Sequence, residues 1–294
     1  MKQEDLRDAD CGIAQAAAVI GDWQSLLILR EVAGGNARFE GIQRELGISR
    51  RALTERLLAL VEDGVLHKQQ YLPRPPRFDY LLTQKGEGFL PVLIALQDWG
   101  TRHIAGDGEL TATTSPGSLE FHRVHELIGT ALPALALPGH DGELHPLASA
   151  SWQVLYFFPG AYAPSENGYP RGWERIPGAP GCTLESKTFA QHYGSFQALG
   201  VEVAGVSMQR PDQLEAFAKW AEIPFPLLSD QDGKLAATLR LPTFRASGLD
   251  RFKRFSLMVD PGGIIGEVQL PITDPAGSVT EALGYFREQL SVSR

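Results

Sequence analysis

The sequence predicts two domains of different class: an α+β domain of short helices with one hairpin, followed by an α/β domain. A length of 294 residues favours about two domains. Apolar residues repeat at helical spacing in the first hundred positions, whereas strands alternate with helices after about residue 119. A stretch rich in Gly, Thr and Ser separates the two patterns. We therefore divide the chain into residues 1–106, a linker at 107–118, and residues 119–294.

The first domain reads as helices followed by a hairpin. Leu26–Leu29 indicates a buried helix, Phe39–Leu46 a second, and Ser49 offers an N-cap hydroxyl to a third. Two strand-like runs joined by Pro-Arg-Pro-Pro-Arg and a final helix follow, at residues 65–72, 78–83 and 88–104.

The second domain alternates strands and helices. Buried-type strands are expected at residues 154–158, 201–206, 256–259 and 264–269. Helices are expected at residues 183–199, 212–221 and 279–290. This alternation is typical of an α/β layer fold.

Composition and charge restrict the location and the partners. The acidic N-terminus lacks the apolar core of a signal peptide, and no run approaches the roughly 18 apolar residues of a membrane span. Two cysteines make no disulfide framework, so we expect a protein of the reducing cytoplasm with no membrane partner. The net charge of −8 gives no sign of nucleic-acid binding, yet residues 49–77 carry six basic and three acidic side chains, a local +3.

The order of helix, helix, Ser-capped helix and hairpin is that of a winged helix-turn-helix. Its third helix would enter the major groove, and its hairpin tip would meet the DNA backbone. We expect DNA contacts from Ser49, Arg50, Arg51, Thr54, Arg74 and Arg77. A solvated helix face and turn is the alternative reading of these charges.

Short motifs carry a specific resemblance over the first hundred residues. Cys11-Gly-Ile, Gly21-Asp-Trp-Gln-Ser, Leu53-Thr-Glu-Arg-Leu and Pro75-Pro-Arg-Phe-Asp-Tyr resemble the HxlR-type transcriptional regulators in type and order. The resemblance implies a homodimer that docks paired helices on a palindromic double-stranded DNA operator. It also places Cys11 where many members carry a redox-sensing cysteine. A small buried apolar residue is the alternative for Cys11.

Cys182 lies at an expected helix start, after Pro180 and Gly181. A thiol in the first turn of a helix is favoured as the thiolate, the species that attacks a peroxide oxygen. An inert structural cysteine is the alternative reading.

The surroundings of Cys182 resemble the peroxiredoxins of the thiol-specific-antioxidant class, on a thioredoxin-like fold. Ile176-Pro-Gly-Ala-Pro-Gly-Cys-Thr-Leu-Glu, Pro224-Phe-Pro-Leu-Leu-Ser-Asp and Arg254-Phe-Ser-Leu-Met-Val-Asp carry the match, from about Leu119 to Leu290. The resemblance makes Cys182 the peroxidatic cysteine and Arg254 the arginine that pairs with its thiolate. A surface arginine is the alternative for Arg254.

Two departures from this family concern its chemistry. Ala179 stands three residues before Cys182, where the family has Thr or Ser, and an insertion of about sixteen residues divides the motif. Thr183 or Ser165 is a candidate for the missing hydroxyl, and Thr183 joins Cys182 and Arg254 as a catalytic candidate. Lys187 stands where many relatives place a resolving cysteine, so an oxidised Cys182 must wait for a small thiol, another chain or Cys11.

The sequence therefore predicts a redox-responsive transcriptional regulator that binds DNA and senses or reduces peroxide through Cys182. Peroxide and a small thiol or thioredoxin-like reductant are the expected partners of the second domain, with no cofactor and no metal. A one-cysteine thiol peroxidase of low turnover, whose winged helix serves dimerisation or DNA tethering, is the alternative. A third possibility is a domain that binds something else, with both cysteines inert.

Overall fold

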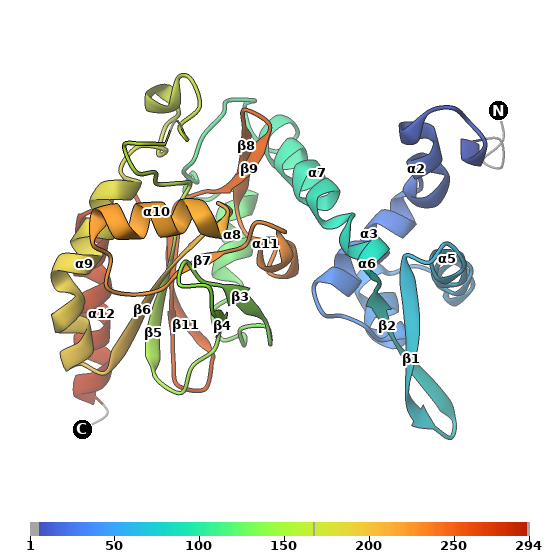
Figure 1. Cartoon of the computed structure of the whole chain (residues 1–294). Helices are drawn as coiled ribbons and strands as arrows, with labels where there is room; N and C mark the ends of the chain where they lie inside the picture. Colours follow the sequence, from blue (N-terminus) through green and yellow to red (C-terminus); the bar gives the residue numbers. More distant parts are fainter. Residues whose placement is uncertain (1–5, 167, 293–294) are drawn as a thin grey trace. The chain divides into compact units, whose positions relative to one another are not determined.

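The computed structural model describes residues 6–166 and 168–292, and the chain divides into two compact units. The first unit ends at Leu93 and the second begins at Ile94 (Figure 1). Helix α7 (Leu90–His103) carries the boundary. The fold class predicted from the sequence is confirmed: a helix-turn-helix unit precedes a unit built on a mixed sheet.

The first unit contains helices and one hairpin. In chain order they are α2 (Gly12–Ile20), α3 (Trp23–Ala33), α4 (Phe39–Leu46), α5 (Arg50–Glu62), β1 (Leu66–Pro73), β2 (Pro76–Leu82) and α6 (Gln84–Glu87). Ile28, Ile42, Leu53 and Leu57 form its core with their neighbours, which fixes the helices around α5. Removing such side chains from water supplies the main driving force for packing.

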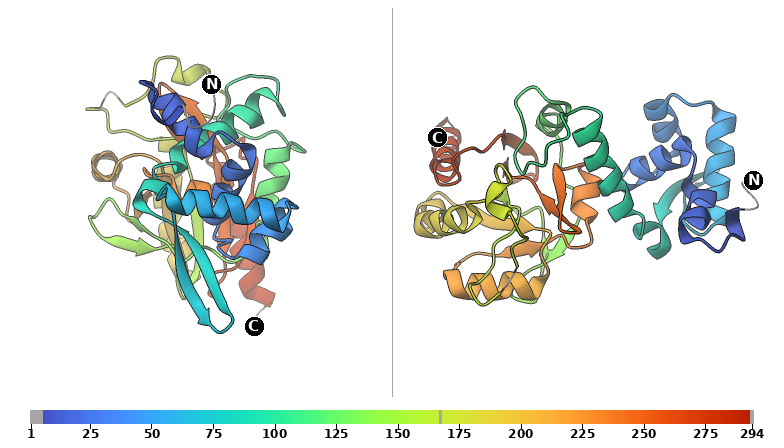
Figure 2. Two further views of the ribbon diagram at one scale, coloured as in Figure 1. Left: turned by 90° about the vertical axis from the view of Figure 1, so that its right-hand side faces the viewer. Right: turned by 90° about the horizontal axis from the view of Figure 1, so that it is seen from above.

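Strands β1 and β2 form an antiparallel hairpin that extends beyond the helices of this unit (Figure 2). The pairing runs from Leu66 opposite Leu82 to Pro73 opposite Pro76. The strands therefore continue into the Pro-Arg-Pro-Pro-Arg segment, which the sequence predicted to be a loop. Tyr71, Leu72 and the tip are exposed, as a solvated two-stranded arm requires.

The second unit has a five-stranded sheet in the order β11-β10-β5-β6-β7. These strands are β5 (Trp152–Phe157), β6 (Val201–Ser207), β7 (Leu227–Ser229), β10 (Phe255–Val259) and β11 (Ile265–Gln269). Strand β5 pairs in parallel with β6 and antiparallel with β10. Two small hairpins accompany the sheet: β3 (Ala136–Pro138) with β4 (Leu144–Pro146), and β8 (Thr243–Ala246) with β9 (Leu249–Phe252).

Helices cover the sheet and complete the core. Val154 and Tyr156 on β5 join one buried cluster with residues of α9 (Cys182–Ala198), α10 (Pro211–Ala221) and α12 (Gly277–Val292). Helices α9 and α12 lie side by side (Figure 1). The remaining helices are α8 (Leu119–His125), the 3-10 turn η1 (Trp173–Arg175) and α11 (Lys234–Thr238). The carboxyl end of β5 thus leads through a long connection to the N-terminus of α9.

The segment predicted as a linker is packed over part of its length. Ala112 is fully buried in the core of the second unit, and its N–H donates to Pro177 O at 2.8 Å. Its carbonyl accepts from the Arg254 N–H at 3.0 Å. Composition alone predicted that this stretch is a linker. Its backbone groups nevertheless form hydrogen bonds with residues far away in the chain.

No single helix among the described residues has the length and apolar character needed to cross a membrane. One pair of helices bent by 77°, Gly12–Ile20 with Trp23–Ala33, passes that test jointly, on length and composition alone.

Candidate functional site

Cys182 is the first residue of α9 and is buried, with 2% of its surface exposed. Gly181 precedes it with a φ of +109°, and a Cβ there would lie 2.7 Å from Cγ of Pro275, so only glycine suits this position. The Cys182 thiol donates to the Ala179 carbonyl at 3.5 Å. The N-terminal dipole of α9 favours negative charge on this sulfur.

Arg254 approaches the same sulfur from the segment between β9 and β10. Its side chain is fully buried, and Nη2 lies 3.3 Å from Cys182 Sγ. The same nitrogen donates to the carbonyls of Gly178, Ala179 and Pro180 at 3.1–3.4 Å. A buried cation thus fixes the loop before α9 and faces the thiol. The alternative reading of Arg254 as a surface arginine is therefore wrong.

Glu185, one turn into α9, is the ion-pair partner of Arg254. Its Oε2 accepts from Arg254 Nη1, and both side chains are fully buried. Burial raises the pKa of Glu185 to about 7, although the charge of Arg254 acts in the opposite direction. Sequence reasoning did not select Glu185, since a glutamate in a helix normally reads as a solvated residue.

Thr183, a catalytic candidate from the sequence, lies beside Cys182 and is half-buried. Thr183 is near enough to Tyr169, a residue of the insertion before α9, to lower the pKa of its phenol. Burial raises the pKa of the Tyr169 phenol, and the negative charge of Cys182 acts in the same direction. Ser165, the other hydroxyl considered, is exposed. No periodicity or motif in the sequence identified Tyr169.

The insertion is held by an aromatic cluster around a buried arginine. The ring of Tyr169 lies 4.9 Å from that of Tyr162 and 5.5 Å from that of Trp173, between centroids. Arg251 Nη1 donates to the Tyr162 hydroxyl at 3.0 Å and to the Pro159 carbonyl at 3.2 Å. The Arg251 guanidinium also lies 5.0 Å from the Trp173 ring. The insertion is therefore anchored to β9 rather than free.

Lys187 is at the position of the expected resolving cysteine, and its ammonium group lies over a tryptophan ring. Its Nζ lies 4.3 Å from the centroid of the Trp220 ring on α10. This cation–π contact directs the ammonium toward Trp220. The positive charge that contacts the Cys182 sulfur is therefore that of Arg254.

The predicted DNA-reading residues gather at the start of α5. Ser49 is its N-cap, as the sequence predicted, and its hydroxyl accepts from Ala52 N at 3.1 Å. Thr54 Oγ1 donates to the Arg50 carbonyl at 2.8 Å. Arg50 lies 4.8 Å from the Phe39 ring, and Arg51 pairs with Glu55 at 2.8 Å. All four predicted residues of this helix start are exposed.

Arg74 and Arg77 lie at the tip of the β1–β2 hairpin and are exposed. Arg77 pairs with Leu72 in the strand register, and Arg74 is in the turn. The helix start and the hairpin tip thus each present two arginines to solvent within the first unit.

Cys11 is the N-cap residue of α2, with extended backbone, and its thiol is exposed and unbonded to any cysteine. It is not the buried apolar residue that was the alternative. Among the described residues, no group of three or more His, Cys, Asp or Glu side chains is arranged to hold a metal ion.

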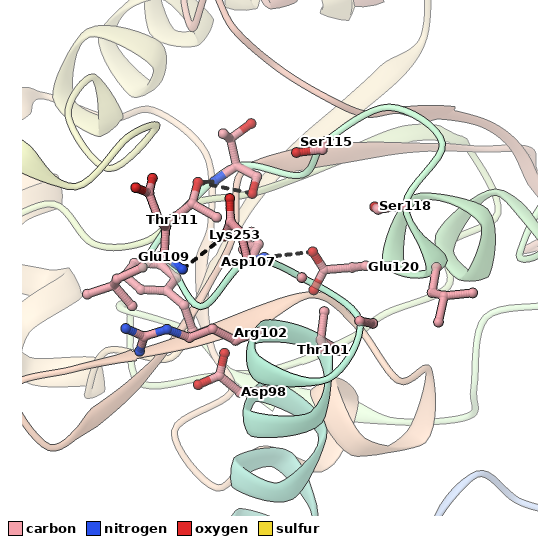
Figure 3. Close-up of a pocket in the computed structure, with 16 residues that line it drawn as sticks. Asp98, Thr101, Arg102, Asp107, Glu109, Thr111, Ser115, Ser118, Glu120 and Lys253 are labelled. Carbon is pink, nitrogen blue, oxygen red and sulfur yellow. Dashed lines mark hydrogen bonds and ion pairs between the residues drawn. The ribbon is translucent and has the colours of Figure 1, made fainter.

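A cavity of about 190 Å³ in the second unit lies beside the packed part of the predicted linker (Figure 3). Lys253 lines it, with its Nζ donating to Glu120 at 2.7 Å. The Thr114 hydroxyl donates to the same carboxylate at 3.0 Å. Gly178, in the loop before α9, packs so closely on this segment that a Cβ would lie 2.8 Å from Thr113 Cβ.

Fold and site together define a helix-turn-helix protein joined to a domain with a buried thiol at a helix start. The family model described as HxlR-like helix-turn-helix matches residues 19–107. An HTH-type transcriptional regulator of Methanothermobacter thermautotrophicus is 36% identical over 91 residues, 31% of this chain and 70% of that protein. The chain therefore belongs to the HxlR-like helix-turn-helix regulators.

The chain also matches part of two mycobacterial regulators. HTH-type transcriptional regulators of Mycobacterium bovis and Mycobacterium tuberculosis are 36% identical over 92 residues, 31% of this chain. The chain spans 58% of the length of these two proteins.

The second unit carries an AhpC/TSA domain. The AhpC/TSA family model matches residues 175–268. Peroxiredoxin Bcp of Escherichia coli is 28% identical over 145 residues, 48% of this chain and 83% of that protein. The solved structure of peroxidoxin BcpB from Mycobacterium tuberculosis is similar with a TM-score of 0.46 and 23% identity, over 55% of this chain and 96% of that one.

Proposed function

We propose that the chain is a cytoplasmic, dimeric, redox-responsive transcriptional regulator that binds double-stranded DNA through its winged helix and senses or reduces peroxide through Cys182. One observation carries the proposal: a thiol at a helix start lies 3.3 Å from a buried arginine, in a chain that also has an HxlR-like domain. The roles of Cys182, Arg254 and Thr183 are part of this proposal.

The chemistry proposed at Cys182 is the two-electron reduction of a peroxide. The thiolate attacks the terminal oxygen of ROOH, an S–O bond forms and the O–O bond breaks. Cysteine is oxidised to sulfenic acid, and the departing alkoxide takes up a proton to become ROH. Arg254 stabilises the thiolate before attack, because a charge-assisted hydrogen bond in a buried site is strong. A small thiol or a thioredoxin-like protein returns the sulfenic acid to the thiol.

The proposed DNA contacts are the exposed residues at the start of α5 and at the hairpin tip. Arg50 and Arg51 reach base edges or phosphates, Ser49 and Thr54 lie beside them, and Arg74 and Arg77 meet the backbone. The salt bridge of Arg51 with Glu55 is exposed, so a phosphate can replace the carboxylate at little cost.

The chain segment that follows the regulator domain is hydrogen-bonded to the surroundings of the thiol, which supports communication between the two. The HxlR-like match ends at residue 107, and Ala112 follows five residues later. Ala112 hydrogen-bonds both to Pro177, in the loop before Cys182, and to the backbone of Arg254. An oxidation that displaces this loop therefore acts on the segment that leads back to α7.

The same site supports one alternative, a one-cysteine thiol peroxidase whose winged helix serves dimerisation or tethering. Both cysteines are free thiols, and the sequence holds no third that could act as a resolving partner. Turnover would then depend on an external thiol.

A mobility-shift assay with the DNA upstream of the gene tests the proposal. Wild type and Cys11→Ser should change DNA affinity after peroxide treatment, and Cys182→Ser should not. Peroxide consumption with added dithiothreitol is measured on the same samples. Sustained consumption with unchanged DNA affinity would favour the peroxidase. A response that persists without either cysteine would contradict both functions.

A further inference from the structure

Glu120 is a buried carboxylate beside residues 111–114, the packed part of the predicted linker. It is the second residue of α8 and only 3% exposed. Its Oε2 accepts from Lys253 Nζ at 2.7 Å (Figure 3) and from the Thr114 hydroxyl at 3.0 Å. Arg123 Nη2 lies 3.8 Å from the other oxygen, Oε1. A carboxylate buried this deeply without partners would be costly, so these contacts are what stabilise it there.

Lys253 connects this carboxylate to the arginine at the thiol. It directly precedes Arg254, whose Nη2 lies 3.3 Å from Cys182 Sγ. The Lys253 side chain is buried, and its backbone N–H donates to Pro242 O at 2.9 Å. The bond between Glu120 and Lys253 therefore limits how far Arg254 can move relative to the sulfur.

Thr114 connects the same carboxylate to the loop before α9. It is buried and lies two residues after Ala112. The Ala112 N–H donates to Pro177 O at 2.8 Å, and the Ala112 carbonyl accepts from the Arg254 N–H at 3.0 Å. Hydrogen bonds are stronger in a buried site than in water, so the carboxylate of Glu120 fixes both chain segments firmly.

We infer that Glu120 is a positioning residue for the reaction proposed at Cys182. Through its two donors it keeps the Arg254 guanidinium and the loop before α9 in place around the thiolate. The inference rests on the peroxide chemistry proposed for Cys182 and adds to it a group that acts through other residues. Arg254 stabilises the thiolate only while Nη2 stays within hydrogen-bonding distance of the sulfur. A misplacement of about 1 Å in a reactive site can cost about a hundredfold in rate.

The test uses the full chain with Cys11→Ser as background, so that Cys182 is the one thiol left in the sequence. Thr114→Val keeps the volume of the side chain and removes the hydroxyl that donates to Glu120. It should slow the oxidation of Cys182 by hydrogen peroxide about threefold or more. It should also raise the pKa of the thiol, measured as the rate of iodoacetamide alkylation against pH, because a loosened Arg254 stabilises the thiolate less.

Two controls separate the hydrogen bond of Thr114 from packing and from the substitution itself. Thr114→Ser keeps the hydroxyl and should behave like the background. Thr130→Val makes the same change at a threonine whose hydroxyl donates to Leu127 O at 2.7 Å, outside this cluster, and should also behave like the background.

Glu120→Gln combined with Lys253→Met tests the other donor. The double variant removes both charges of the buried pair together, so neither is left without its partner. The glutamine oxygen can still accept from the Thr114 hydroxyl. The double variant should therefore lose the connection to Arg254 through Lys253, and it should show slower oxidation and a raised thiol pKa.

Each outcome decides between the inference and its rivals. A background rate in either Thr114→Val or the double variant would overturn the inference and leave the proposed function intact. Slower oxidation with an unchanged thiol pKa would also overturn it, since access to the sulfur would have changed rather than its contact with Arg254. Equal slowing in Thr114→Val and Thr114→Ser would assign the effect to packing and overturn it as well. A background protein that reacts with peroxide no faster than free cysteine would instead overturn the proposed function, and with it the reaction that Glu120 positions.

Discussion

Glu185→Gln should alter how the stability of the second unit depends on pH. Burial raises the pKa of Glu185 from 4.5 to about 7 in the folded chain, against the attraction of Arg254. Between those pH values the folded protein holds a proton that the unfolded chain has lost. The stabilisation of the folded chain by the protonated Glu185 is therefore complete below pH 4.5. It is lost as the pH rises through 7. The difference between a pKa of 4.5 and one of about 7 corresponds to about 3 kcal/mol of unfolding free energy.

Urea unfolding of wild type and variant at several pH values measures this effect. The glutamine side chain of the variant does not titrate, so the difference in unfolding free energy, wild type minus variant, should fall by about 3 kcal/mol between about pH 4.5 and 7.5. Other titrating groups are common to both proteins and cancel. A difference that stays constant or grows with pH would mean that Arg254 outweighs burial and that the carboxylate is ionised throughout.

Three further predictions concern the two functions. Alanine at both Arg50 and Arg51 should weaken DNA binding and flatten its salt dependence in anisotropy titrations, because fewer counterions are released; an unchanged slope would remove α5 as the reading helix. Arg254→Lys should slow peroxide oxidation of Cys182 about tenfold in stopped-flow, since lysine lacks the planar fork; a wild-type rate would contradict this. Mass spectrometry after peroxide treatment should find Cys182 as a sulfenic acid or mixed disulfide and Cys11 oxidised more slowly. A dominant peptide with a Cys11–Cys182 disulfide would contradict this division between the two cysteines.

Sequence reasoning succeeded where the determining interactions are local. The Ser49 cap is decided within four residues, and the period of the apolar residues then fixes which face of α5 is buried. The strands β5 and β6 are short apolar runs bounded by turns, and both were located from the sequence to within two residues.

The contacts that build the candidate site are not local. Arg254 and Glu185 are 69 residues apart, and nothing in either neighbourhood predicts that they meet. Tyr169 belongs to an insertion without periodicity, so its position follows only from the packing of Tyr162 and Trp173. Ala112 lies in a Gly-, Thr- and Ser-rich stretch that composition marks as a linker, and only the distant partners of its backbone make it part of the core.

Under the function proposed for Cys182, we expect its surroundings to favour a long-lived oxidised state, which suits a signal better than rapid turnover. The position five residues after it is Lys187, held over Trp220, so α9 supplies no thiol to condense with a sulfenic acid. Because only 2% of Cys182 is exposed, we expect an incoming thiol to react when the first turn of α9 opens locally. That opening breaks the contacts of Arg254 with the loop before α9, to which Ala112 is also bonded. The step that permits reduction therefore loosens the same segment that would carry the signal.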